Sequence, residues 1–169
     1  MPFERVVDLA NLASERRVEN LPKLTVALDD PNEAIRWWGA LGCAMLRHKA
    51  VPAEAALRQR LDDPSGAVQA AAAEALTYVG HADLALPVLE RWITNTNETF
   101  YSLHAANVLI RLGEGGRPLL PLMKKTYADT QDDARNTAPA YLHRILERNI
   151  ALLEGREPTL VYPTFQGGK

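Results

Sequence analysis

A unit of 33 residues recurs along the chain and constrains the fold more than any other feature of the sequence. The segment Leu28-Asp29-Asp30-Pro31 returns 33 residues later as Leu61-Asp62-Asp63-Pro64. In the same register, Leu76 is followed by two further leucines, Leu109 and Leu142. A fixed period of this length indicates stacked units, each of which buries its apolar face only against its neighbours. The chain is therefore predicted to be a repeat array.

Each unit is predicted to form two amphipathic helices joined by an acidic turn. Leu86, Leu89 and Ile93 lie three and four residues apart, which places them on one face of the first helix. The Asp-Asp-Pro turn ends that helix, because the residue before a proline is pushed out of the helical region. Gly80 and Gly113 are typical of the residue that closes the second helix.

Arg36 follows the buried position of the first repeat and faces an acidic turn. It is expected to pair with Asp62 or Asp63 as a structural ion pair. An exposed pair of this kind stabilises a fold by about 0–1 kcal/mol.

The predicted helices follow the repeat. A leading helix at about 3–15 precedes four pairs, at about 20–29 with 33–47, 53–62 with 66–79, 83–94 with 98–112, and 116–128 with 132–152. Pro139 lies inside the last of them, so that helix either kinks there or begins again with Thr137 as its N-cap.

The predicted fold class is all-α, a right-handed α–α superhelix of about four helix pairs with an N-terminal cap helix. A repeat domain is expected at 1–153 and an extended C-terminal tail at 154–169. Leucine and alanine supply 49 of the 169 residues, which favours helices because both are strong helix formers. The apolar run Leu160-Val161-Tyr162-Pro163-Thr164-Phe165 is expected to lie along this domain or along a partner.

The charge balance and the cysteine count exclude several classes of protein. Lys and Arg number 19 and Asp and Glu 21, giving a net charge of −2, so no nucleic-acid partner is expected. The longest stretch without these charged residues, Thr99–Ile110, is too short to span a bilayer, so no membrane contact is expected. Cys43 is the single cysteine, so the fold is expected to hold without an internal disulfide.

The segment Leu61–Gly80, with its acidic turn, its alanines and its closing glycine, resembles the HEAT repeat, and the resemblance extends over about residues 4–150. Three segments, Phe3–Ala10, Asn20–Leu24 and Asn32–Gly42, are similar to the C-terminal HEAT-like domain appended to some bacterial sulfatases. That resemblance implies a covalently linked catalytic domain as partner and an exported or periplasmic protein. Without such a domain a cytoplasmic location is expected, since no signal peptide follows Met1.

No catalytic or metal-binding pattern is recognised in the sequence. The sulfatase hallmark Cys-x-Pro-x-Arg is matched only at Cys43 and Arg47, without the proline, and Cys43 aligns with core leucines. No two of the four histidines lie at helical spacing, so no metal pair is predicted. The segment Gly113-Glu114-Gly115-Gly116 lacks the lysine of a phosphate loop. We therefore expect no enzyme activity, no cofactor and no metal in this chain.

The second helices are expected to line the concave surface of the superhelix. Two positions in each repeat are expected to be exposed there: Trp37 and Leu41, Ala70 and Glu74, Leu103 and Asn107, and Asn136 and Ala140. Seven residues of this surface, two flanking arginines included, are the candidate partner-binding residues: Trp37, Leu41, Glu74, Leu103, Asn107, Arg111 and Arg144. Trp37 allows two interpretations, because it either packs on the leading helix as part of the cap or lines an apolar groove.

Two classes of function are compatible with this pattern. The favoured class is a non-catalytic scaffold for protein–protein or interdomain contact. The alternative is a nucleic-acid-binding or DNA-repair protein of the HEAT-like type, and the net charge of −2 argues against it. No residue set supports the bilin-lyase chemistry that some related repeats carry.

Overall fold

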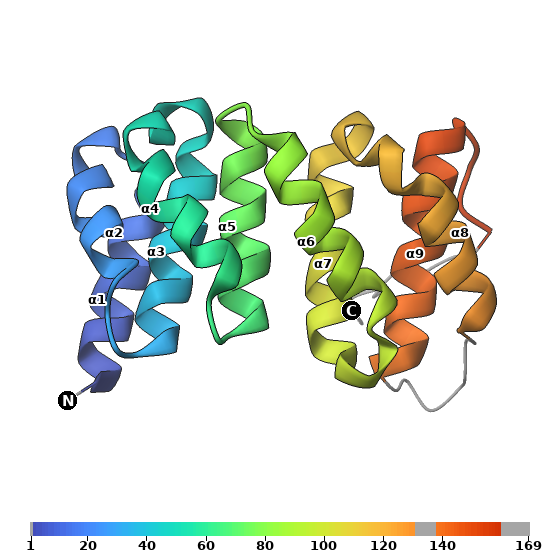
Figure 1. The fold of residues 1–169 in the computed structure, drawn as a ribbon, viewed down its shortest axis with the longest axis horizontal. Coiled ribbons are helices and arrows are strands. Elements are labelled where there is room, and N and C mark those ends of the chain that lie inside the picture. The colour runs from blue at the N-terminus through green and yellow to red at the C-terminus, as the bar shows by residue number, and fades with distance from the viewer. Residues whose placement is uncertain (1, 131–137, 160–169) are drawn as a thin grey trace, which may run out of the picture.

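The computed structural model describes residues 2–130 and 138–159, which form a row of helices without a strand (Figure 1). The α-helices are α1 (Pro2–Ser14), α2 (Leu21–Ala27), α3 (Glu33–Leu46), α4 (Glu54–Gln59), α5 (Gly66–Tyr78), α6 (Ala82–Thr94), α7 (Thr99–Leu112), α8 (Leu120–Asp129) and α9 (Ala138–Glu154). Short 3₁₀ segments lie between them at Val18–Asn20, Arg47–Ala53, Arg60–Asp62, Thr96–Glu98 and Gly113–Leu119.

The helices form two layers. In one layer α1 packs against α3, α3 against α5, α5 against α7 and α7 against α9. The other helices, α2, α4, α6 and α8, each pack against the helix that follows, and α4 and α6 lie nearer the viewer than α3 and α7 in Figure 1. The all-α solenoid of helix pairs predicted from the 33-residue repeat is confirmed.

Small residues set the spacing between these helices. The alanines at positions 70 to 73 of α5 are fully buried, which lets the backbones of α3 and α7 approach α5 from either side. Gly39 of α3 lies where α2 crosses, and a Cβ atom there would stand 2.9 Å from the carbonyl oxygen of Leu24. The alanine excess of the sequence is thus a consequence of helix stacking.

A buried ion pair joins the first two repeats. Arg36 Nε donates to Asp63 Oδ2 at 2.7 Å, and Arg36 Nη2 donates to Asp63 Oδ1 at 2.9 Å. The same guanidinium donates to the carbonyl oxygens of Asp30 and Pro31. The predicted pairing is confirmed for Asp63, but the expectation of an exposed pair is wrong, because Arg36 is 8% and Asp63 3% exposed.

The last repeat differs in part from the sequence prediction. Helix α9 places Pro139 in its first turn, where a proline is tolerated, and the predicted cap Thr137 lies outside the described residues. Helix α9 ends at Glu154, next to Gly155 with φ of 70°. The chain then returns along α9, where the backbone N–H of Thr159 donates to Glu147 Oε1 at 2.9 Å. The apolar run 160–165 lies outside the described residues, and the 153/154 boundary stays a prediction.

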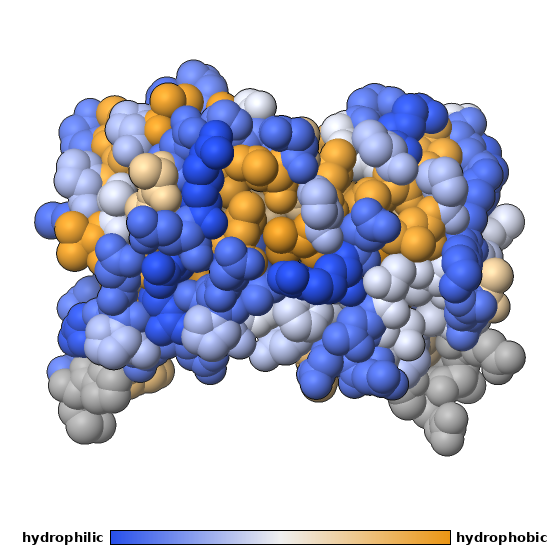
Figure 2. Space-filling view, in the orientation of Figure 1, coloured by the Kyte–Doolittle hydropathy of each residue, from blue (hydrophilic) through white to orange (hydrophobic). Residues whose placement is uncertain are grey.

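The face seen in Figure 2 carries apolar residues over the middle of the row, around α4, α5 and α6, with hydrophilic residues along its lower edge. In the described ranges, each helix is too short or too polar to cross a bilayer.

Candidate functional site

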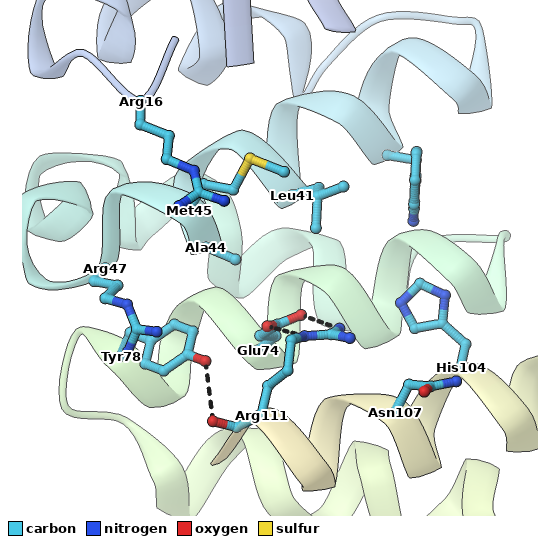
Figure 3. Close-up of a pocket in the computed structure, with 11 residues that line it drawn as sticks. Arg16, Leu41, Ala44, Met45, Arg47, Glu74, Tyr78, His104, Asn107 and Arg111 are labelled. Carbon is cyan, nitrogen blue, oxygen red and sulfur yellow. Dashed lines mark hydrogen bonds and ion pairs between the residues drawn. The ribbon is translucent and has the colours of Figure 1, made fainter. Parts of the chain in front are cut away.

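A pocket of about 430 Å³ opens on the layer of second helices (Figure 3). Its walls come from three consecutive repeats, because α3, α5 and α7 all contribute side chains, and the loop after α1 adds one more. The lining residues are Arg16, Trp37, Leu41, Ala44, Met45, Arg47, Glu74, Tyr78, His104, Asn107 and Arg111. A volume in this range is typical of ligand pockets.

Helix α3 supplies the apolar wall of the pocket. Leu41, Ala44 and Met45 lie along it, and Trp37 stands one turn before them. The ring of Trp37 meets Trp38 edge-on at 4.9 Å between centroids and His104 of α7 edge-on at 6.3 Å. Because His104 belongs to the repeat after next, these rings meet above the small alanines of α5.

A bidentate ion pair occupies the middle of the pocket (Figure 3). Arg111 Nε and Nη2 each donate to a carboxylate oxygen of Glu74 at 2.6 Å. Hydrogen bonding to Glu74 raises the pKa of Arg111 and outweighs the opposing effect of burial. Glu74 is 3% exposed, so the expectation that it projects freely from the concave face is wrong. Both oxygens of its carboxylate accept hydrogen bonds from Arg111.

Tyr78 connects this pair to a second arginine. The guanidinium carbon of Arg47 lies 4.6 Å from the centre of the Tyr78 ring, a cation–π contact. The Tyr78 hydroxyl donates to the carbonyl oxygen of Arg111 at 3.4 Å. Burial, followed by the charge of Glu74, raises the pKa of Tyr78, so this hydroxyl stays protonated at neutral pH.

Two ring nitrogens in the pocket wall have no hydrogen-bond partner within the described ranges. They are Nε1 of Trp37 and Nε2 of His104, and both atoms are buried. Burial, together with the charge of Arg111, lowers the pKa of His104, so its imidazole is neutral at pH 7. Unsatisfied buried polar groups cost about 1–3 kcal/mol each.

The structure brings together five of the seven predicted partner-binding residues. Trp37, Leu41, Glu74, Asn107 and Arg111 line the pocket, whereas Leu103 and Arg144 do not. Two further positions expected to be exposed, Ala70 and Ala140, are fully buried, because neighbouring helices close over these small side chains. Asn136 lies outside the described residues.

Sequence reasoning missed Arg16, Arg47, Met45, Tyr78 and His104. The clearest available signal was at Arg47, which shares the repeat register with Gly80 and Gly113. An arginine at a position that other repeats fill with glycine marks a departure from the repeat pattern. His104 carried no such signal, since it reaches the pocket only through the packing of α7.

The described residues match neither the pattern of a metal site nor that of a reactive cysteine. Within these ranges no group of three His, Cys, Asp or Glu side chains is placed to hold a metal ion. Burial raises the pKa of the Cys43 thiol to about 12, so it remains a protonated core side chain. The side chains that line the pocket can bind a ligand through charge, hydrogen bonds and apolar contact.

Comparison with known proteins identifies the repeat. A family model described as HEAT repeats matches residues 54–142, more than half of the chain. No curated protein and no solved structure matches the chain.

Proposed function

The chain belongs to the HEAT-repeat family, and from this premise we propose that it is a non-catalytic scaffold whose concave pocket holds a protein partner or a covalently linked domain. HEAT repeats generally mediate protein–protein contacts, and members of the family are typically non-catalytic. The pocket carries the proposal, because it draws its walls from three repeats and combines an apolar side with arginines. Tryptophan and arginine are the side chains most often dominant in interface energetics.

Trp37 favours the groove interpretation over the cap interpretation. Its ring meets the rings of Trp38 and His104 edge-on, and it lines the pocket. A residue that served only the N-terminal cap would direct its ring to α1.

Site-specific cross-linking tests the scaffold role. A photo-reactive benzoylphenylalanine replaces Leu41 in the pocket, and the control replaces Phe100, which is 78% exposed and outside the pocket. Irradiation in cells followed by mass spectrometry is expected to give one dominant adduct from position 41 that position 100 does not give. Equal adduct patterns from the two positions would remove the pocket as the contact surface.

The finer proposal is that the chain is the C-terminal module of a sulfatase-like enzyme. It is supported by the similarity of the three N-terminal segments and by exposed apolar side chains near α1. Phe3 is 71% and Val26 76% exposed, which suits contact with a preceding domain. Such a protein would be exported or periplasmic, and a scaffold without the enzyme would be cytoplasmic.

The reading frame upstream of Met1 tests this finer proposal. A preceding catalytic domain with an intact Cys-x-Pro-x-Arg segment is expected. An in-frame stop codon directly before Met1 would contradict it and would leave the scaffold proposal standing.

Nucleic-acid binding is the less supported function. Arg111 is engaged by Glu74, and the chain carries a net charge of −2. Phosphate binding is strongest in low salt, so a gel-shift titration under that condition is the most sensitive test. No shift is expected with duplex or single-stranded DNA.

A further inference from the structure

Two arginines at the pocket adopt a backbone conformation that favours glycine. Arg16 and Arg47 both have φ of 53°, and among the described residues they are the non-glycine residues with positive φ. Both line the same pocket. Arg47 shares the repeat register with Gly80 and Gly113, and its ψ of −134° is close to the −121° of Gly113.

This conformation is unfavourable for an arginine, because a side chain with a Cβ atom rarely adopts it. At the corresponding helix end, two other repeats have a glycine with positive φ, Gly80 and Gly113, and glycine adopts this conformation without strain. Strained residues cluster at binding sites, where the side chain has a role that glycine cannot fill. For Arg16 and Arg47, the guanidinium group is the part that glycine would lack.

The pocket is positively charged, although the whole chain is acidic. Arg16, Arg47 and Arg111 line it against a single lining carboxylate, Glu74, and that carboxylate is bound by Arg111. Figure 3 shows the three arginines extending toward the pocket from separate helix ends. Arg16 and Arg47 thus remain to meet an anion, and a guanidinium pairs best with a carboxylate or a phosphate.

Beside these charges lie one apolar wall and the ring of Trp37, whose Nε1 is buried. Leu41 and Met45 form the neighbouring apolar surface. A ligand that matches the free arginines and the apolar wall carries an anion and an aliphatic group.

We propose that the pocket binds an acidic peptide segment, in which a Glu or Asp carboxylate meets Arg16 and Arg47 and an adjacent aliphatic side chain packs on Leu41 and Met45. This inference rests on the proposed scaffold function and names the chemistry of its partner.

A titration followed by nuclear magnetic resonance tests this site. The indole N–H signal of Trp37 is assigned with the variant Trp37→Phe and followed in the full ¹⁵N-labelled chain. The probe is the capped peptide acetyl-Leu-Glu-Leu-Glu-Leu-Glu-amide, and its control replaces each Glu with Gln. A saturable shift of the Trp37 signal is expected with the Glu peptide, and at least tenfold weaker binding with the Gln peptide. Equal binding of the two peptides, or no shift with either, overturns the proposal.

The variant Arg47→Gly separates binding from folding. It removes one guanidinium group and introduces glycine, the residue that the following repeats carry at this position. The thermal midpoint of unfolding is therefore expected to stay unchanged or to rise. The affinity for the Glu peptide is expected to fall about tenfold. Arg16→Gly is expected to have the same two effects, and it tests the proposal independently in case Arg47→Gly perturbs the fold. The control Arg148→Ala changes the net charge equally at an exposed site on α9 outside the pocket and is expected to leave affinity within twofold. Unchanged affinity in both glycine variants contradicts the proposal.

A third peptide, with phosphoserine in place of each Glu, identifies the preferred anion. Tight binding of this peptide without measurable binding of the Glu peptide would overturn the carboxylate assignment. The cross-linking experiment at position 41 separates this inference from the scaffold role. A specific adduct at position 41 without binding of the Glu peptide would refute the acidic-peptide proposal and leave the scaffold proposal standing. The absence of both the adduct and the peptide binding would refute both proposals.

Discussion

Replacement of Asp63 by alanine is expected to destabilise the fold more than any surface substitution, because it breaks the buried pair that joins the first two repeats. Arg36 would keep only its bonds to the carbonyl oxygens of Asp30 and Pro31, inside a site where its side chain is 10% exposed. Removing one partner of a buried ion pair costs about 3–5 kcal/mol.

Asp63 also makes a hydrogen bond at the start of α5. Its Oδ1 accepts the backbone N–H of Ser65, the residue before α5, at 2.9 Å, and the loss of such a buried hydrogen bond costs about 1 kcal/mol. Asp63→Ala is therefore expected to lower the free energy of unfolding by about 4–6 kcal/mol, against a total of roughly 5–15 kcal/mol for an ordinary domain.

Urea unfolding followed by circular dichroism measures this effect. The control is Asp62→Ala, an exposed neighbour, expected to change stability by less than about 0.5 kcal/mol. The double variant Arg36→Met/Asp63→Ala removes the stranded cation and is expected to be at least about 1 kcal/mol more stable than the sum of the single changes predicts. A loss below about 1 kcal/mol for Asp63→Ala would refute the reasoning, because the pair would then not hold the repeats together.

Three further predictions concern the same fold. Leu76→Ala is expected to cost about 2–5 kcal/mol in urea unfolding, because Leu76 is fully buried, and a loss below 1 kcal/mol would mean that the repeat register is wrong. Arg47→Gly is expected to raise the unfolding free energy by about 1 kcal/mol, since relief of about 1–3 kcal/mol of backbone strain exceeds the lost contact with Tyr78, and a lowered thermal midpoint would contradict this. Burial acts to raise the pKa of Asp63, but hydrogen bonds from Arg36 and Ser65 outweigh it and hold that pKa below its usual range. Its stabilising effect is therefore fully present above about pH 5 and lost as the pH falls through the folded pKa, so acid titration of stability is expected to be shallower in Asp63→Ala than in the unchanged chain.

The helices were predictable because the repeat marks their ends with proline, acidic residues and glycine. The predicted pair 83–94 and 98–112 lies within one residue of α6 and α7 at every end. Register also predicts which face of a second helix is concave, and Trp37, Leu41 and Asn107 do line one pocket.

Whether a residue expected on the concave surface is exposed or buried was not predictable from its place in the repeat alone. Glu74 sits at a position expected to be exposed, yet Arg111, 37 residues further on, reaches back and covers it. Ala70 is buried for a different reason, since a small side chain is closed over by larger neighbours. Such outcomes depend on the sizes of side chains in adjacent repeats, which a pattern of apolar spacing does not encode.

Trp37→Ala gives the most direct test of the claim that the concave pocket is the binding site. The measurement compares thermal unfolding with cross-linking from position 41 in the same variant. The pocket account predicts a folded solenoid, with a thermal midpoint lowered by only a few degrees, that no longer forms the specific adduct. An unfolded variant would assign Trp37 to the cap, and a folded variant with an undiminished adduct would contradict the account.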